Sequence, residues 1–374
     1  MKVAHVIQSY PPVLGGAQRQ LQRLGPILER RGVHGTVITR RRPGTPRRAR
    51  EPGLDVIRIP VPERSASASI AYTAGGIAAL ARLRPDVIHV YDLLSPATIA
   101  LAGGAVTGAP VVAKVLSAGH GGDVDRLLHK PLGARRLAMQ ARRFAAFACL
   151  SDDVEQDLAA HGVPRERLRR VPNGVDADEF RPARDAAERS ALRRELGLAE
   201  QGLLSLYCGR FADVKRVDVL VEAFRSAPGR LLLVGDGHEE ERLRSLAAAA
   251  ELGGRVEVRE TVDDPAPLFR AADLYLSASG TEGMSGSVLE AMASGLPVVA
   301  AEASGMDELL AAGCGVLLPR ATPAAVAAAI GELERDGARR ERLGDAARAR
   351  VTSSYRLEAV ADLLAGLYEE VLRR

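Results

Sequence analysis

Short apolar runs alternate with amphipathic segments along almost the whole of this 374-residue chain. In the first half, the runs predict strands at residues 3–8, 35–39, 56–59, 87–90, 111–115, 147–151 and 168–171. The segments 17–31, 69–82 and 133–147 between them carry apolar residues at helical spacing. Because the runs are apolar throughout and do not alternate with polar residues, they predict a parallel sheet with helices on both faces.

The second half repeats this plan. It predicts strands at residues 204–208, 231–234, 256–259, 274–278, 298–301 and 315–318, and helices at 216–224, 239–250 and 323–335. A stretch rich in Gly, Pro and Asp, residues 172–182, separates the halves and is typical of a hinge. The predicted fold class is therefore α/β, with two Rossmann-like β/α/β domains that face each other across a cleft.

The segment 282–300 concentrates the candidate chemistry. It follows the predicted strand 274–278 and leads through a loop into a short helix that stops at Gly295 and Pro297. Ligands of open α/β sheets bind at the carboxyl ends of strands, and the amides of a helix N-terminus favour phosphate. The carboxylates of Glu282 and Glu290, eight positions apart, repel phosphate, so we expect them to hold hydroxyl groups. Phosphate together with many hydroxyls describes a nucleotide sugar.

Further motifs occur in order along the chain. They are Gly15-Gly16, the segment 172–176 followed by Phe180, Gly209-Arg210 with Lys215, and the turn 234–237. The whole set resembles the family 4 retaining glycosyltransferases (GT4), whose Glu-x7-Glu signature matches Glu282 and Glu290. This resemblance implies the two-domain GT-B fold. Residues 1–172 would bind the acceptor, residues 173–355 would bind the donor, and a last helix, 356–374, would cross back to the first domain.

The resemblance also implies roles for residues of the second domain. Arg210 and Lys215 would stabilise the departing diphosphate, Glu282 would contact hydroxyls of the donor sugar, and Glu290 would hold the ribose. The remaining donor contacts would come from Gly209 and from the amides of Met284, Ser285, Gly286 and Ser287. Two structural alternatives stay open. Ser287 and Glu290 also fit a helix capping box, and Arg210 and Lys215 could be ordinary surface cations.

The first domain offers looser candidates. Gly15 and Gly16 follow the first predicted strand, where glycines let backbone amides approach a phosphate closely, although a plain tight turn would look the same. His120 and Asp123 lie in a Gly-rich loop after strand 111–115. Relatives often have a His or a glycine-rich turn here, near the donor sugar, so His120 is a catalytic candidate and Asp123 a substrate-binding candidate; a flexible loop is the alternative. Lys114 is a weaker candidate for an acceptor or phosphate contact.

No metal and no cofactor are expected. Asp123 with Asp125, and Asp176 with Asp178, have the Asp-x-Asp spacing of metal-dependent transferases, but neither pair ends a clear strand. No Gly-x-Gly-x-x-Gly fingerprint is complete, which argues against an NAD-dependent dehydrogenase. The expected reaction is retaining hexosyl transfer from a nucleoside-diphosphate sugar, UDP favoured over GDP, to a hydroxyl acceptor. A nucleotide-sugar epimerase or phosphorylase on the same fold, or a non-catalytic nucleotide-sugar-binding protein, would be the competing function.

Composition narrows the classes further. Aromatic residues make up 3% of the chain and Trp is absent, which counts against aromatic platforms for sugars or for single-stranded nucleic acid. No nucleic-acid partner is therefore expected. The chain lacks a signal-peptide pattern and a long apolar run, which predicts a cytoplasmic protein. The widely spaced Cys149, Cys208 and Cys314 are expected to be buried free thiols.

Two groups of arginines bear on the identity of the acceptor and on membrane binding, and both questions stay open. Six arginines lie between residues 40 and 50 in a predicted loop, and Arg135, Arg136, Arg142 and Arg143 recur in pairs on a predicted helix. Such clusters could dock the protein on the inner face of an anionic membrane, attract a phosphorylated acceptor or form a solvated surface. Acceptor candidates are therefore lipid-linked sugars, polysaccharides and small metabolites such as aminocyclitols.

Overall fold

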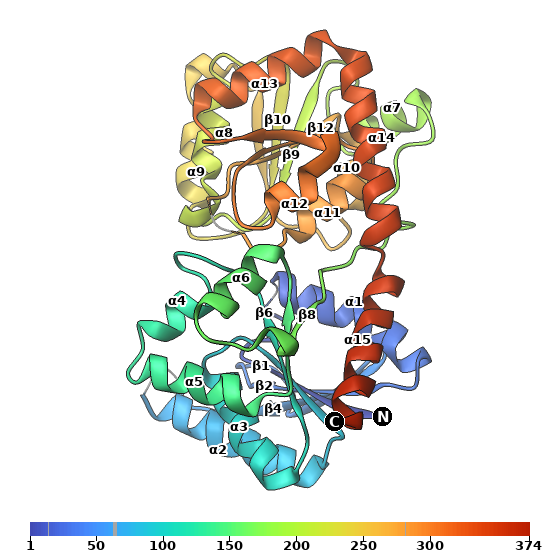
Figure 1. The fold of residues 1–374 in the computed structure, drawn as a ribbon. Coiled ribbons are helices and arrows are strands. Elements are labelled where there is room, and N and C mark those ends of the chain that lie inside the picture. The colour runs from blue at the N-terminus through green and yellow to red at the C-terminus, as the bar shows by residue number, and fades with distance from the viewer. Residues whose placement is uncertain (14, 63–65, 281) are drawn as a thin grey trace. The chain divides into compact units, whose positions relative to one another are not determined.

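The computed structural model describes residues 1–13, 15–62, 66–280 and 282–374, and the chain divides into two units. Unit 1 comprises Met1–Asn173 and Leu357–Arg374, and unit 2 comprises Gly174–Arg356. Each unit is built on one predominantly parallel sheet with helices on both of its faces (Figure 1). The α/β class and the two Rossmann-like units expected from the apolar pattern are confirmed.

The sheet of unit 1 has eight strands within the described residues, in the order β3-β4-β2-β1-β5-β6-β7-β8. They are β1 (Lys2–Ile7), β2 (His34–Arg40), β3 (Arg48–Glu51), β4 (Leu54–Ile59), β5 (Val87–Tyr91), β6 (Val111–Val115), β7 (Ala146–Cys149) and β8 (Leu168–Arg170). Strands β2, β3 and β4 lie on one side of β1, and the later strands β5 to β8 lie on the other side. The sheet therefore has its topological switch point between β1 and β5, where such folds place ligands.

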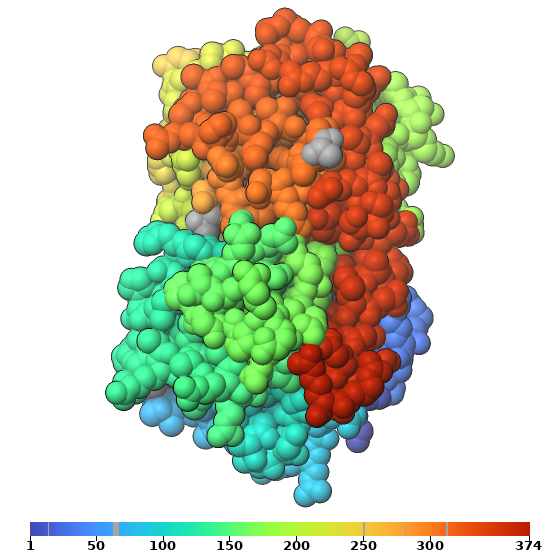
Figure 2. Space-filling view, in the orientation of Figure 1, coloured from blue at the N-terminus to red at the C-terminus, as the bar shows by residue number. Residues whose placement is uncertain are grey.

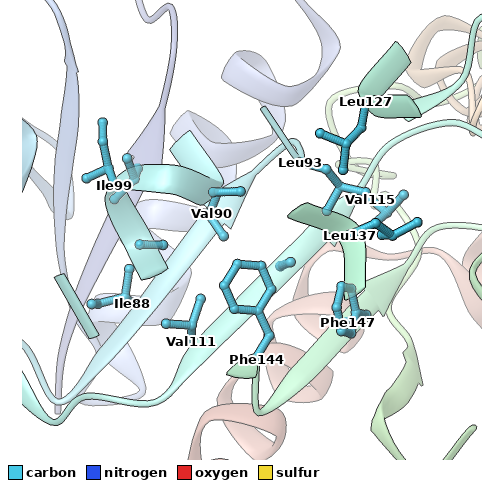
Figure 3. Packing of buried hydrophobic residues seen from close by; sticks show 14 of the residues in the cluster. Ile88, Val90, Leu93, Ile99, Val111, Val115, Leu127, Leu137, Phe144 and Phe147 are labelled. Atoms are coloured by element: carbon cyan, nitrogen blue, oxygen red, sulfur yellow. The ribbon is translucent and has the colours of Figure 1, made fainter. Parts of the chain in front are cut away.

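Apolar residues of both faces of this sheet are covered by helices. The helices of unit 1 are α1 (Gly16–Arg30), α2 (Ala66–Leu83), α3 (Ser95–Thr107), α4 (Asp123–Leu128), α5 (Gly133–Arg143), α6 (Asp152–Ala160), the short 3₁₀ turn η1 (Arg165–Arg167) and α15 (Leu357–Arg373). Val90 and Val111 pack with residues of α2, α3 and α5 on one face (Figure 3). On the other face, Val87 and Val112 pack under α1 and α15.

The C-terminal helix belongs to unit 1, as expected. Its Asp362 pairs with Arg31 at 2.5 Å, and its Glu370 accepts from Arg169 Nε at 2.9 Å. Figure 2 shows the end of this helix, in dark red, beside the green segment that contains Arg169. Tyr368 of the same helix bonds the buried His89 Nδ1 at 2.6 Å, so α15 is attached by polar contacts as well as by its apolar face.

One strand was missed in the sequence. Residues 40–50 were expected to form a loop, but β3 occupies Arg48–Glu51 and pairs antiparallel with β4 at the sheet edge. The sequence Arg-Ala-Arg-Glu is not apolar because an edge strand needs no buried side chains on its outer side. The strand was not predicted because its residues are mostly charged. Charged residues at a sheet edge also keep the edge from pairing with another chain.

The sheet of unit 2 has six strands in the described part of the chain, all parallel, in the order β11-β10-β9-β12-β13-β14. They are β9 (Leu204–Cys208), β10 (Arg230–Val234), β11 (Val256–Arg259), β12 (Leu274–Ser277), β13 (Val298–Ala301) and β14 (Gly315–Leu318). The switch point of this sheet lies between β9 and β12.

The helices of unit 2 cover both faces of its sheet. They are α7 (Ala186–Glu195), η2 (Asp213–Lys215), α8 (Val217–Ala223), α9 (Glu240–Ala247), η3 (Ala250–Leu252), α10 (Ala266–Ala271), α11 (Gly286–Ala293), α12 (Met306–Leu310), η4 (Ala311–Gly313), α13 (Pro323–Arg335) and α14 (Gly337–Ser354). Residues of α8, α9 and α13 share one core with the sheet. On the opposite face, Phe269 of α10 stacks on Tyr275 of β12.

Candidate donor-binding site

The loops after β9 and β12 meet at the switch point of the unit 2 sheet. Gly280 N donates to Val214 O at 3.2 Å, and Ser279 Oγ donates to the same carbonyl at 3.2 Å. The loop after β12 is thereby attached to η2, the turn that carries Lys215. Two segments more than sixty residues apart in the sequence thus present their side chains at one place.

Lys215 and Glu282 form an ion pair at this junction, through Lys215 Nζ and Glu282 Oε1. Their side chains are 25% and 12% exposed, so the pair is partly shielded from water. Lys215 ends the 3₁₀ turn η2. Arg216, the first residue of the predicted helix 216–224, has a left-handed conformation, and α8 begins after it at Val217. The pairing fixes the ammonium group, and a fixed charge loses little entropy when it meets an anion.

Helix α11 begins four residues after Glu282 in the sequence. Its N-cap is Ser285 and its first residue is Gly286, so the capping-box alternative, with Ser287 as the N-cap, is wrong. No acidic side chain lies in the first turn, and the first amides of a helix have no intrahelical acceptor. Together with the helix dipole, these amides form an anion-binding end. Glu290 lies one turn further on and is 5% exposed.

Glycines hold the loops after β9 and β10 close together. Gly209 N donates to Val234 O at 2.9 Å, and Phe211 N donates to Asp236 O at 2.6 Å. A Cβ on Gly235 would lie 1.9 Å from Gly209 O, and one on Gly237 would lie 2.1 Å from Phe211 O. Only glycine fits at both positions, which explains the turn at residues 234–237. Arg210 is exposed in the loop that these contacts shape.

The candidates of unit 1 lie at the carboxyl edge of its own sheet. Gly15 is the N-cap of α1, and Gly16 is exposed at its first position, with open space where a Cβ would stand. His120 has a fully exposed side chain, and its Nδ1 is 3.8 Å from Asp125. In the loop of His120, the amides of Gly121 and Gly122 already donate to Asp125 at 2.8 Å and to Gly119 O at 2.9 Å.

Asp123 and Lys114 are engaged by the chain itself. The buried Asp123 carboxylate accepts from the amides of Leu116 at 2.5 Å and Ser117 at 3.2 Å, and it pairs with Arg126. Its role in the structure is to hold the Gly-rich loop in place. Lys114 is buried and donates to Asn173 Oδ1 at 3.3 Å, and burial lowers its pKa to about 8.

The Asp-x-Asp pairs do not form metal-ligating groups in the described residues. Asp125 accepts from Gly121 N at 2.8 Å, Asp176 accepts from Glu179 N at 2.9 Å, and Asp178 pairs with Arg356 at 2.9 Å. One other group, Asp213 with His238 and Glu239, brings its ligand atoms within 4.8 Å of one another, but two of its members are exposed and His238 already contacts Asp213. A cavity of about 250 Å³ beside it is lined by η2, α8 and α9 but does not include Lys215 or Glu282.

The arginine groups are only partly exposed. Arg135, Arg142 and Arg143 of α5 are exposed, whereas Arg136 turns inward and donates to Leu94 O at 3.2 Å. Arg40 lies over the ring of Tyr72 at 4.9 Å. The helices of the described chain include none with the length and apolarity needed to cross a membrane.

The cysteines were expected to be buried free thiols, and this holds for two of the three. The thiols of Cys149 and Cys314 are buried and free, while Cys208 is only half-buried at the end of β9.

Asp92, directly after β5, was missed as a candidate, because its only signal in the sequence is a polar residue that follows an apolar run. Its backbone φ of 112° is evident only in the structure.

Comparison with known proteins identifies the family. The family model "Glycosyl transferase 4-like domain" matches residues 15–174, and "Glycosyl transferases group 1" matches residues 188–350. A D-inositol 3-phosphate glycosyltransferase of Xylanimonas cellulosilytica is 31% identical over 96% of this chain and 93% of its own. A GDP-mannose-dependent alpha-mannosyltransferase of Mycobacterium tuberculosis is 30% identical over 100% of this chain and 98% of its own.

Solved structures show the same fold. HepE of Anabaena in complex with UDP-glucose superposes with a TM-score of 0.82 at 19% identity, covering 99% of this chain and all of that one. The chain belongs to the GT4 glycosyltransferases, and its two units form the GT-B fold. It is an enzyme of the hexosyltransferase class.

Proposed function

We propose that this enzyme transfers a hexose from a nucleoside-diphosphate sugar, with UDP favoured over GDP, to a hydroxyl acceptor, with retention of configuration and without a metal ion. The observation that carries the proposal is the Lys215–Glu282 pair, whose carboxylate belongs to the loop that leads into α11. The donor diphosphate would lie between Lys215 and the α11 amides, and Glu282 would contact sugar hydroxyls.

Electrostatics support a diphosphate at this position. Two unit charges 4 Å apart attract by about 4 kcal/mol at an effective dielectric of 20, so one ammonium group can offset much of the negative charge of a leaving group. The α11 amides and the helix dipole add further stabilisation, and the first turn of α11 carries no acidic side chain. Because Lys215 and the amides supply fixed positive charge, the site has no need of a metal bridge.

The buried Glu290 is suited to hydroxyls. Its position in the second turn of α11 places it behind the amides, where a carboxylate can accept two hydrogen bonds from a vicinal diol. This is the arrangement expected for a ribose. The names of similar proteins agree with such donors, since one relative is named for GDP-mannose and one solved neighbour contains UDP-glucose.

Retention requires that the acceptor attack the face that the diphosphate leaves. In the proposed step the bond between the anomeric carbon and the phosphate oxygen breaks as the bond to the acceptor oxygen forms, and the acceptor proton passes to the departing phosphate oxygen. The protein orients the partners and stabilises the charge that develops on the diphosphate. Attachment to a membrane through the exposed arginines of α5 stays a prediction.

Nucleotide binding to the intact protein tests this proposal. Thermal unfolding is measured with UDP, GDP and ADP, with and without EDTA, because a ligand at about 100 times its Kd adds about 2.7 kcal/mol of stability. We expect a shift that survives EDTA and is largest for UDP. Lys215→Ala should weaken nucleotide binding by about 10–100-fold, as the loss of a hydrogen bond to a charged group costs about 1.5–3 kcal/mol.

Matched variants identify the site. Arg230→Ala removes an exposed cation at the amino end of β10, the opposite edge of the same sheet, and should bind nucleotide like the wild type. Lys215→Ala combined with Glu282→Gln removes both members of the ion pair, which separates lost attraction from the repulsion of an unpaired Glu282. Wild-type protein that binds no nucleotide, or Lys215→Ala that binds as tightly as Arg230→Ala, would refute the proposal. The anomeric configuration of the product, read by NMR, tests retention.

A further inference from the structure

Asp92 occupies the switch point of the unit 1 sheet. It follows β5 directly, and β5 is the strand that lies beside β1, where the chain reverses its direction of building. The loop after β1, with Gly15 and Gly16, ends at the same edge. In unit 2 the corresponding place holds Lys215 and Glu282. Asp92 is therefore a polar side chain at the position where this kind of sheet receives a ligand.

The backbone at Asp92 is strained. Its φ is 112°, a region that residues with a Cβ rarely adopt and that costs about 1–3 kcal/mol. The surrounding residues impose this conformation. Tyr91 is buried on one side of Asp92, and Leu93 points into the core near Val115 and Leu137 on the other (Figure 3).

Hydrogen bonds from α5 fix the backbone that follows. Gln140 Nε2 donates to Leu93 O at 2.9 Å, and Arg136 donates to Leu94 O at 3.2 Å. With both flanks of Asp92 fixed, its side chain has little freedom to turn away from the edge of the sheet. Glycine would be free of the strain at this position, so the sequence retains a side chain here at a cost in stability.

The carboxyl group of Asp92 also lowers the stability of the folded protein when it is ionised. Oδ1 accepts from Leu94 N at 2.7 Å, while in residues 1–13, 15–62, 66–280 and 282–374 no hydrogen bond reaches Oδ2. Burial raises the pKa of this carboxyl to about 7, and the nearby Asp123 adds to the rise. The nearest cations are used elsewhere: Arg126 pairs with Asp123, and Arg136 bonds Leu94 O.

Strain and a half-buried carboxyl at one residue of a switch point indicate selection for function over stability. We propose that Asp92 binds the acceptor, and that it takes a hydroxyl or amino group of a polyol or aminocyclitol in preference to a phosphate group. This inference rests on the proposed glycosyl transfer and specifies the acceptor chemistry that unit 1 receives.

The preference follows from the charges at the site. An oxygen of Asp92 can accept a hydrogen bond from a hydroxyl, and an ammonium group would meet a carboxylate of opposite charge in a partly desolvated place. A phosphate would meet like charge at Asp92, and the nearest cations already have partners, since Arg126 pairs with Asp123 and Arg136 donates through Nη2 to Leu94 O. The phosphate in the name of the D-inositol 3-phosphate glycosyltransferases is therefore not expected near Asp92.

Calorimetric titration of the full chain at pH 8, where the Asp92 carboxyl is ionised, tests the inference on UDP-saturated protein with three probes: streptamine, myo-inositol and D-inositol 3-phosphate. We expect affinity to fall in that order for the wild type. Asp92→Asn keeps the Oδ1 acceptor and tolerates positive φ, so it removes little besides the charge. It should bind streptamine at least about tenfold more weakly, the effect of about 1.4 kcal/mol, and should lose the preference over the phosphorylated probe.

Asp86→Asn is the matched control, since Asp86 is an exposed aspartate just before the amino end of the same strand β5 and should leave all three affinities at wild-type values. Asp92→Gly, which also relieves the strain, should lose the preference as Asp92→Asn does. Equal binding by the wild type and Asp92→Asn, tightest binding of the phosphorylated probe, or no binding of any probe to UDP-saturated protein would overturn the inference. Failure of UDP itself to bind would refute the proposed function instead.

Discussion

Replacing Asp92 by Asn should stabilise unit 1 in a pH-dependent manner. Asn keeps the acceptor for Leu94 N and removes only the ionisable group. The carboxyl is ionised in the unfolded chain above its ordinary pKa of 3.8 but keeps its proton up to about pH 7 in the folded protein, because burial disfavours the charge. Groups that face it are Asp123, Arg126 and Arg136, and their effects are included in this value.

The sign follows from proton binding. Between pH 3.8 and about 7 the folded wild type holds more protons than the unfolded chain, so its stability falls as the pH rises through this window and is constant above it. A tenfold change in proton affinity corresponds to about 1.4 kcal/mol. The rise in pKa therefore makes the ionised side chain cost at most about 4 kcal/mol, a loss that Asp92→Asn does not suffer.

Differential scanning calorimetry at pH 4 and pH 8 measures this cost. For domains of 150–250 residues, 1 kcal/mol moves Tm by about 2–4 °C, so the Tm of unit 1 in Asp92→Asn should exceed that of the wild type by about 5 °C or more at pH 8. At pH 4 the two should nearly coincide. A difference in Tm that does not change with pH, or a less stable variant at pH 8, would refute the reasoning. Asp86→Asn, at the exposed end of β5, should show no such dependence.

Two substitutions test the construction of unit 2. Gly235→Ala places a methyl group 1.9 Å from Gly209 O. It should therefore cost about 1–3 kcal/mol of stability and weaken UDP binding in titration. In the control Gly331→Ala, in α13, the methyl group meets only the flexible end of Arg335, so neither stability nor UDP binding should fall. Asp273→Ala removes the partner of Arg193, which is 4% exposed and bonded at 2.6 Å, and should cost about 3–5 kcal/mol in urea unfolding; a loss below about 1 kcal/mol would show that the pair is not what holds Arg193.

The local pattern of the sequence was enough to predict most strands. Apolar runs such as 111–115 and 204–208 coincide with β6 and β9, because a strand buried on both faces must be apolar throughout. Elements without such an apolar run were not recognised. The edge strand β3 has no apolar run, and the polar helix α14, Gly337–Ser354, was not predicted.

The candidate site was predictable as a set of motifs but not as an arrangement. Lys215 and Glu282 were each identified from the sequence, yet their pairing depends on β9 and β12 being neighbours in the sheet. The engagement of Asp123 by the amides of Leu116 and Ser117 gave no signal in the sequence either. Hydrogen bonds of this kind depend on how a loop closes, which periodicity does not describe.

The sequence by itself determined that this protein has two α/β units and that its candidate chemistry follows particular strands, because periodicity and turn residues act over a few neighbouring positions. Only the tertiary structure decided which loops meet, which carboxylate faces Lys215, and that Asp92 is held at a φ of 112°. These properties depend on strand order and on packing between residues far apart in the chain. The constraint on Asp92, for example, comes from Leu93 in the core and from Gln140 on α5, a helix that lies more than forty residues further along the chain.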